Sequence, residues 1–285
     1  MFEVSVITPV FKAESFLENS VESAVHNPYV GEIILIEDGS PDKSLQVAEK
    51  LAQKYSKVKV YRHPKGANKG AGASRNLGIE KAAFPYIAFL DADDWYLPER
   101  FDECKRIFTE DSTVDYVFGI SQFNHDFDAG NNRYKEMKID SKHAKVFENL
   151  LTSKAGYFDT NSITVRKSSL LKLTHLFNTS LALHQDSELW LRIAYHLKGK
   201  PDVKVRPGSI ARRHSGNRIT GRNASSAAQY WETIFEYFHD KALKKNELKM
   251  IKFFRDYFKK QASKRKASIV DWLIFKLYIL KFRYF

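Results

Sequence analysis

The sequence predicts an α/β fold with a mostly parallel central sheet and helices on both faces. Over the first hundred residues, short apolar runs alternate with segments of helical periodicity, which is the pattern of strand–helix–strand units. Polar clusters follow three of the predicted strands, at 8–11, 37–40 and 91–94. Because ligands of such sheets bind beyond the carboxyl ends of the strands, the three clusters predict one crevice.

The elements follow in order along the chain. Runs rich in Val, Ile, Phe and Tyr predict strands at 4–10, 32–36, 58–61 and 86–90. Helical spacing of apolar residues predicts helices at 15–26, 42–55 and 72–83. The later part is less regular and predicts a strand at 114–120, a loop at 126–133, a helix at 186–197, a strand and basic loop within 204–214, and helices from 224 onward.

The positive charge is unevenly placed. The 285-residue chain carries +12, and residues 241–285 hold 14 Lys/Arg against 3 Asp/Glu, or +11. A basic tail behind a nearly neutral body suggests an anionic surface as partner. The single cysteine, Cys104, excludes an internal disulfide framework. We expect no signal peptide, and no run of about 18 apolar residues predicts a membrane span.

Three carboxylates crowd the end of the strand predicted at 86–90. Asp91, Asp93 and Asp94 fall within four residues, and like charges this close repel one another. A divalent metal that holds a phosphate group would balance them. In extended backbone Asp91 and Asp93 face the same side, with Ala92 opposite. We expect Asp94 to cap the following segment rather than bind metal.

Five motifs together resemble a family 2 glycosyltransferase with the GT-A fold, of the inverting, non-processive kind. They stand at 4–11, 37–42, 68–76, 91–93 and 185–192 and span about the first 220 residues. Each is weak alone, and their order and spacing carry the resemblance. It implies a nucleotide-sugar-binding half at 1–98, an acceptor-binding half of the same domain at 99–222, and a C-terminal amphipathic helical region at 223–285.

The resemblance implies a pocket for the nucleotide base. Asp38 would accept a hydrogen bond from the base, usually uracil, although the motif at 37–40 also suits a plain turn. Phe11, where relatives often carry Tyr, would stack on the base. Thr8 and Pro9 would form the rim of this pocket.

The segment 68–76 combines small residues with cations. Asn68 and Gly70 would let the backbone approach the donor closely, and the start of the next helix would favour an anion. Arg75 would reach a carboxylate of the site or the diphosphate. The alternative is a loop and helix cap with solvated charges.

The resemblance also implies a Mn²⁺ or Mg²⁺ cofactor. Asp93 would contact the metal directly, and Asp91, with Ala92 beside it, would serve the ribose and the metal shell. His214 would complete the shell or touch phosphate, or it is a plain surface histidine. Further phosphate contacts would come from Arg213 and Arg218.

Asp186 is the residue that the resemblance identifies as the general base for the acceptor hydroxyl. Its place before an amphipathic helix also suits an N-terminal cap. Gln185 stands where the family usually has Glu, which removes one charge and leaves the role of that position open. Glu188 is the second candidate for the base.

The tail predicts a basic amphipathic helix at 245–260, followed by an aromatic-rich segment at 269–285. Apolar surface beside cations favours contact of residues 241–285 with an anionic membrane. The alternative is that these helices pack on the body or on a second copy in a homodimer. We expect no nucleic-acid partner.

Together these features predict an inverting transfer of one sugar from a nucleoside-diphosphate donor, with UDP expected, to a hydroxyl of a glycan or lipid-linked acceptor. The setting expected is surface polysaccharide or lipopolysaccharide biosynthesis, peripheral on the cytoplasmic face of the membrane. The Gln-x-x-Arg-Trp signature of processive relatives is missing from the sequence. The alternatives are a sugar nucleotidyltransferase, or a basic membrane- or nucleic-acid-binding protein on a degenerate transferase fold.

Overall fold

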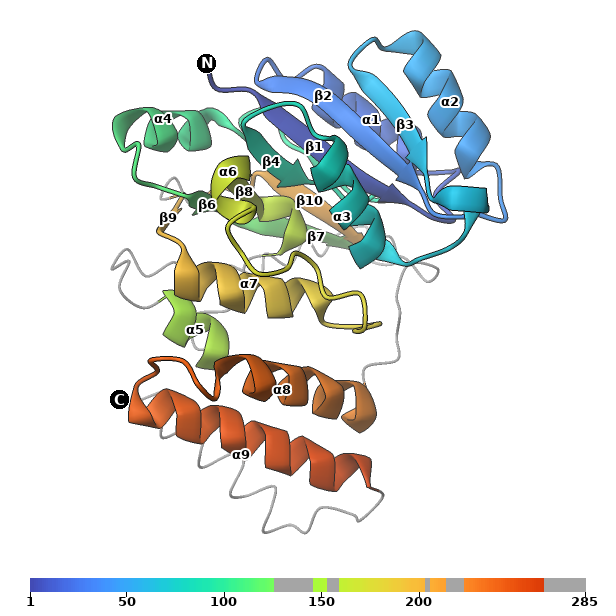
Figure 1. Ribbon diagram of the computed structural model, residues 1–285. Coiled ribbons are helices and arrows are strands. Elements are labelled where there is room, and N and C mark those ends of the chain that lie inside the picture. The colour runs from blue at the N-terminus through green and yellow to red at the C-terminus, as the bar shows by residue number, and fades with distance from the viewer. Residues whose placement is uncertain (126–145, 153–158, 203–205, 214–222, 264–285) are drawn as a thin grey trace.

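A seven-stranded sheet forms the centre of the computed structural model, which describes residues 1–125, 146–152, 159–202, 206–213 and 223–263 (Figure 1). The strands lie in the order β3-β2-β1-β4-β8-β6-β9. Their bounds are β1 (Val4–Val10), β2 (Val30–Glu37), β3 (Val58–Arg62), β4 (Tyr86–Phe89), β6 (Tyr116–Phe118), β8 (Ile163–Arg166) and β9 (Gly199–Pro201). The strands β1 to β4 pair in parallel. Only β8 runs against its neighbours β4 and β6, so the predicted mostly parallel sheet is confirmed.

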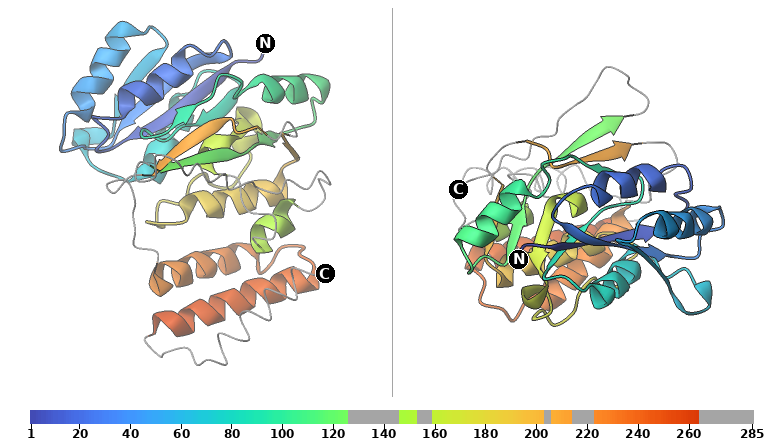
Figure 2. Two further views of the ribbon diagram at one scale, coloured as in Figure 1. Left: turned by 180° about the vertical axis from the view of Figure 1, so that it is seen from behind. Right: turned by 90° about the horizontal axis from the view of Figure 1, so that it is seen from above.

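Helices cover both faces of this sheet (Figures 1 and 2). On one face, α1 (Leu17–Val25), α2 (Ser44–Lys54) and α4 (Asp102–Glu110) share a core cluster with β1 and β2. On the other face, α3 (Ala71–Lys81) and α7 (Gln185–His196) pack against the opposite side chains of the same strands. The inner strands are buried on both faces, which explains their almost unbroken apolar sequence. Short helical turns lie at η1 (Pro64–Gly66), η3 (Thr160–Ser162) and α6 (Lys167–Leu170).

A second, three-stranded sheet stands beside the carboxyl end of β4. It contains β5 (Trp95–Tyr96), β10 (Ser209–Arg213) and β7 (Ser121–His125), with β10 in the middle. Its strand β5 directly follows the acidic run at 91–94. The small sheet therefore lies next to the acidic run at the end of β4.

The predicted elements of the first hundred residues are all present, with ends shifted by up to two residues. The strand predicted at 114–120 corresponds to β6, which is shorter than predicted. The strand predicted within 204–214 corresponds to β10. The helix predicted at 186–197 begins one residue earlier, at Gln185. The loop predicted at 126–133 lies outside the described residues.

The C-terminal region forms two helices, α8 (Ala224–Phe238) and α9 (Lys245–Ala262), that lie side by side (Figure 1). Their apolar residues form a third core cluster with α5 (Val146–Thr152) and α7. On α9 this cluster takes up Met250, Ile251 and Phe254, each at most 7% exposed. The apolar side of the predicted amphipathic helix thus packs on the protein. None of the helices in the described ranges is long and apolar enough to cross a bilayer.

Glu32 is a buried carboxylate near the start of β2, at the edge of the sheet away from the polar clusters. It is 1% exposed. Its Oε1 accepts hydrogen bonds from Ser5 Oγ at 2.7 Å and from the Ala83 amide at 2.6 Å, and its Oε2 pairs with Lys59 Nζ at 2.6 Å. Burial opposes the charge, but these three partners hold the pKa of Glu32 below its usual value. Glu32 therefore links β1, β2 and β3 to the turn before β4.

We expect Glu32→Ala to lower the free energy of unfolding by about 2–4 kcal/mol, because it leaves buried donors unpaired. Since the folded state lowers the pKa of Glu32, its contribution is present above the usual value of 4.5 and is lost as the pH falls below it. Urea unfolding at pH 7 and at pH 3.5 measures both effects. The exposed Glu49→Ala on α2 is the control, expected within about 0.5 kcal/mol of the wild type. An equal loss in the two variants at pH 7 would contradict the role of Glu32.

Candidate active site

The three polar clusters meet at the carboxyl ends of β1, β2 and β4, as the sequence predicts. The amide of Asp38 donates to the carbonyl oxygen of Val10 at 2.9 Å, and the amide of Leu90 donates to that of Ile7 at 3.0 Å. The hydroxyl of Ser20 on α1 donates to the carbonyl oxygen of Asp91 at 3.2 Å. These bonds hold the three clusters together at one edge of the sheet.

Asp38 is buried, and its carboxylate is hydrogen-bonded to the loop before α3. Its Oδ1 accepts the amide hydrogen of Lys69 at 2.7 Å, and its Oδ2 accepts that of Gly70 at 2.9 Å. Asn68 lies exposed in the same loop, and Gly70 has a φ of 84°, in the region that favours glycine. The two oxygens keep further lone pairs for a base. Asp38 therefore positions the backbone of this loop, and its contact with a nucleotide base stays a prediction.

Phe11 and Thr8, both near the end of β1, differ in their exposure to solvent. Phe11 is 44% exposed, with the ammonium group of Lys12 at 5.4 Å from its ring centroid. An exposed ring at this edge suits stacking on a planar ligand. Thr8 is 1% exposed, and its Oγ1 has no hydrogen-bond partner among the described residues. It lies inside the strand end and forms no rim, because its position in β1 directs the side chain inward. Pro9, the other rim residue, is partly exposed.

Arg75 reaches a carboxylate of the site. Its Nη2 lies 2.6 Å from Asp91 Oδ1. The guanidinium group is 5.5 Å from the ring centroid of Phe177, and Arg75 as a whole is 7% exposed. The side chain of Asp91 is 39% exposed. A buried arginine thus fixes the orientation of a carboxylate that stays open to a ligand.

Asp94 differs from its expected role as a cap. It is buried, and it accepts hydrogen bonds from the Arg212 amide at 2.7 Å and from Asn161 Nδ2 at 2.6 Å. The turn after β4 points it inward, where it ties β10 to the main sheet. Burial, and then the charges of Asp93 and Asp91, raise its pKa well above the usual value.

The remaining carboxylates fit a divalent cation. Asp91 and Asp93 are partly exposed, while Ala92 between them is buried. The extended backbone expected here is wrong, because the Asp94 amide donates to the carbonyl oxygen of Asp91 at 3.0 Å and closes a turn. Carboxylate oxygens suit Mg²⁺ or Mn²⁺. Within the described residues, no group of three or more His, Cys, Asp or Glu side chains is arranged to hold a metal. Two carboxylates could supply only part of a coordination shell, and Mg²⁺ sites of this kind are completed by water and substrate phosphates. The cation expected here stays a prediction.

Asp186 lies in the first turn of α7 and is partly exposed. The cap position is His184, with a φ of 64°, so Asp186 is not the N-terminal cap. Gln185 Oε1 is buried without a hydrogen-bond partner in the described part of the chain. Glu188 is fully buried and pairs with Arg192 Nε at 2.6 Å. The second candidate for the base is therefore wrong, because an ion pair inside the core holds its carboxylate away from the site.

The basic loop lies mostly outside the described residues. His214 and Arg218 are among the undescribed positions. Arg213 ends β10, where its backbone pairs with that of His125. The metal and phosphate contacts expected of these residues stay predictions.

Asn161 is the site residue that sequence reasoning missed. It is 3% exposed, accepts the amide hydrogen of Asp91 at 2.9 Å and donates to Asp94. Arg100, also buried, donates to the carbonyl oxygen of Asn161 at 2.9 Å. The motif Thr160–Ser162 resembles any polar turn in sequence. Only the topology, which brings the start of β8 beside the end of β4, identifies its role.

Comparison with known proteins identifies the family of the chain. The profile described as Glycosyl transferase family 2 matches residues 5–172. The minor teichoic acid biosynthesis protein GgaB of Bacillus subtilis is 32% identical over 146 residues, which are 48% of this chain and 16% of that protein. The chain spans less than half the length of several curated relatives that it matches.

Two solved structures share the fold. Staphylococcus aureus TarS in complex with UDP-GlcNAc matches with a TM-score of 0.69 and 15% identity, over 98% of this chain and 80% of that one. The mannosyltransferase PcManGT from Pyrobaculum calidifontis, in complex with GDP-Man and Mn²⁺, matches with a TM-score of 0.60 and 13% identity, over 96% and 79%. The profile match covers more than half of the chain, so the chain belongs to glycosyl transferase family 2 and has the GT-A fold.

Proposed function

We propose that the protein transfers one sugar, with inversion, from a nucleoside-diphosphate donor to a hydroxyl group. The observation that carries this proposal is the meeting of Asp38, Asp91 and Asp93 at one sheet edge, with Arg75 fixing Asp91. UDP is the proposed carrier, in keeping with the UDP-GlcNAc bound by TarS, although PcManGT binds GDP-Man. Family membership favours a transferase over the nucleotidyltransferase and non-enzyme alternatives.

The reaction proposed is a single displacement. Asp186 accepts the proton of the acceptor hydroxyl, whose oxygen forms a bond to the anomeric carbon. The bond from that carbon to the diphosphate oxygen breaks, and the nucleoside diphosphate leaves with the electron pair. One displacement inverts the anomeric centre. Phe11 stacks on the base, and Asp38 keeps the loop at 68–70 in place beside it.

Asp91 and Asp93 are the residues proposed to hold a divalent cation. Their oxygens match the hard-cation chemistry of Mn²⁺ and Mg²⁺, and PcManGT is a relative in fold that binds Mn²⁺. When bound, such an ion neutralises charge on the leaving diphosphate as a Lewis acid. Arg75 contributes a fixed positive charge beside Asp91.

The acceptor proposed is a growing surface glycan or a lipid-linked sugar. The link to the teichoic acid protein GgaB supports a surface polymer over a soluble metabolite. The acceptor classes proposed are precursors of teichoic acid, exopolysaccharide or lipopolysaccharide.

Hydrolysis of nucleotide sugars tests the proposed reaction. The assay measures UDP or GDP release from UDP-Glc, UDP-Gal, UDP-GlcNAc and GDP-Man, with Mn²⁺ and with a chelator. We expect slow release from one donor, lowered about a hundredfold or more by Asp93→Ala and by Asp186→Asn. The exposed Asp240→Ala is the matched control and should keep the wild-type rate. A wild type that does not release UDP or GDP from any donor, and that binds neither nucleotide in calorimetry, would refute the proposal.

The tail is proposed to bring the enzyme to an anionic membrane at its cytoplasmic face. Since the apolar side of α9 is buried against α8, the contact would be electrostatic. Lys245, Lys249 and Lys252 are exposed and spaced for one helix face, and each cation near such a surface contributes about 1 kcal/mol. Residues 264–285, which are basic and aromatic, lie outside the described residues.

Vesicle sedimentation tests this contact. We expect the triple change of Lys245, Lys249 and Lys252 to Gln to weaken binding to vesicles of phosphatidylglycerol and phosphatidylcholine by roughly a hundredfold at low salt. The matched control changes the exposed Lys43, Lys50 and Lys172 of the catalytic body to Gln. Equal binding by the two triple variants would contradict a specific role for α9.

A further inference from the structure

A short segment of the chain is hydrogen-bonded to both sides of the site. We call residues 175–177 the bridging segment. On one side, Asn76 Nδ2 donates to the carbonyl oxygen of Phe177 at 2.9 Å, and the Phe177 amide donates back to Asn76 Oδ1 at 2.9 Å. On the other side, Arg192 donates to the carbonyl oxygens of His175 and Leu176, each at 2.6 Å. The segment thus joins α3 to α7.

The α7 side of this joint is rigid. Arg192 and Glu188 are both 0% exposed, and the carboxylate of Glu188 accepts from Arg192 Nε at 2.6 Å and from Nη2 at 2.8 Å. A buried, doubly bonded ion pair holds one geometry. Asp186 lies two residues before Glu188 on the same helix, so the position of the bridging segment sets the position of the proposed base.

The α3 side leads to the acidic cluster. Asn76 directly follows Arg75, which holds Asp91. The guanidinium group of Arg75 also stacks against the ring of Phe177, and that ring packs edge-on against those of Phe89 and Trp190. One turn of α3 therefore contacts both the carboxylate of the donor half and the bridging segment.

Gly72 allows α7 to approach this closely. A Cβ atom at Gly72 would lie 1.7 Å from Gln185 Oε1 and 3.4 Å from the Cβ atom of Phe177. Gln185, the residue before Asp186, thus fills the space that a side chain on α3 would occupy. The oxygen Oε1 of Gln185 has no hydrogen-bond partner within the described residues, so Asn76 supplies the directional bonds between α3 and the bridging segment.

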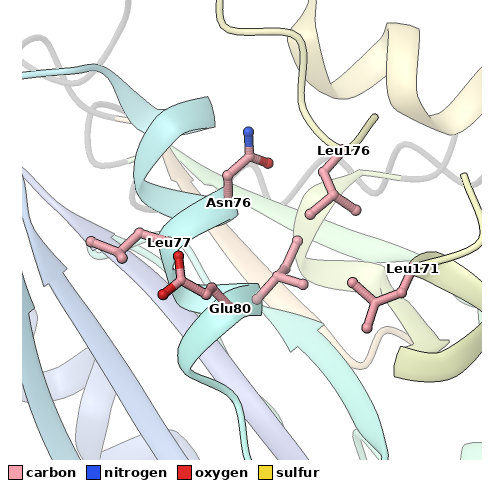
Figure 3. Close-up of a pocket in the computed structure, with 6 residues that line it drawn as sticks. Asn76, Leu77, Glu80, Leu171 and Leu176 are labelled. Atoms are coloured by element: carbon pink, nitrogen blue, oxygen red, sulfur yellow. The ribbon is translucent and has the colours of Figure 1, made fainter. Parts of the chain in front are cut away.

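Packing holds the Phe177 end of the bridging segment, where the residue is 2% exposed, more closely than the flank at Leu176. A pocket of about 480 Å³ lies beside it and is lined by Asn76, Leu77, Ile79, Glu80, Leu171 and Leu176 (Figure 3). Asn76 on α3 and Leu176 on the bridging segment line the same pocket. Where a close-packed core would hold a segment through many contacts, this flank is open. The two bonds of Asn76 add to the packing of Phe177 a directional constraint that the open flank does not supply.

We propose that Asn76 is a positioning residue that sets where Asp186 lies relative to Asp91 and Asp93. The proposal rests on the proposed function, in which Asp186 is the base. The two sides of the site come from segments about one hundred residues apart. A base must lie within hydrogen-bond reach of its proton, and a shift of about 1 Å costs roughly a hundredfold in rate.

The first test separates binding from turnover. The probe is whichever donor of the panel the wild type hydrolyses fastest. We expect Asn76→Ala to lower kcat by ten- to a hundredfold while the Kd for UDP or GDP changes less than twofold. Asn76→Asp keeps the shape of the side chain and the acceptor for the Phe177 amide, but it places an acceptor against the Phe177 carbonyl oxygen, so kcat should fall in this variant too. Glu80→Ala, one turn later on α3 and lining the same pocket, is the control and should keep the wild-type kcat.

A double-mutant comparison tests whether Asn76 affects the rate through Asp186. If Asn76 acts through Asp186, adding Asn76→Ala to Asp186→Asn should lower the remaining rate less than threefold, because the base is already lost. Hydrogen exchange gives a readout without turnover, since the amides of 175–188 should exchange faster in Asn76→Ala and those of 224–238 should not.

The outcomes distinguish this inference from the proposed function. An unchanged kcat in Asn76→Ala, or a full additive loss in the double variant, would overturn the positioning role while wild-type turnover still supported the transferase. A wild type that neither binds nor releases a nucleoside diphosphate would refute the proposed function, and the positioning role with it.

Discussion

The crowding of negative charge at the end of β4 is the constraint on which the rest of the site depends. Three carboxylates in four residues persist there only because each has a different environment. Asp91 has the guanidinium group of Arg75, Asp94 is buried with two donors and a raised pKa, and Asp93 is partly exposed to solvent. The neighbouring elements, from α3 to the small sheet, supply these partners.

Much of the fold was predictable because local signals and tertiary packing agree there. The central strands are mostly apolar, and the helices α1 and α2 have clear apolar periodicity. The motif residues Asp38, Arg75 and Asp91 were also identifiable, since charge beside small residues at strand ends points to a ligand. The local sequence pattern therefore indicates that a site is present and at which edge of the sheet it lies.

The supporting residues could not be found in this way. Asn161, Asn76 and Phe177 act through contacts across 70 to 101 positions of the chain. Nothing in their neighbourhoods separates them from ordinary turn or core residues. Glu188 was wrong as a candidate base for a similar reason. Only the folded helix shows that it forms a buried ion pair with Arg192, one turn later. The apolar face of α9 was recognised correctly, but the sequence did not reveal that α8 covers it.

The reversed direction of β8 determines how the end of β4 is supported. Because β8 runs against β4, the chain enters the site from η3, just before the strand, and Asn161 is delivered at that point. The turn η3 is therefore held at the end of β4 by buried bonds, because Asn161 accepts from the Asp91 amide and donates to Asp94. A change of sequence in η3 would thus act directly on the acidic run, although the two segments lie about 70 positions apart.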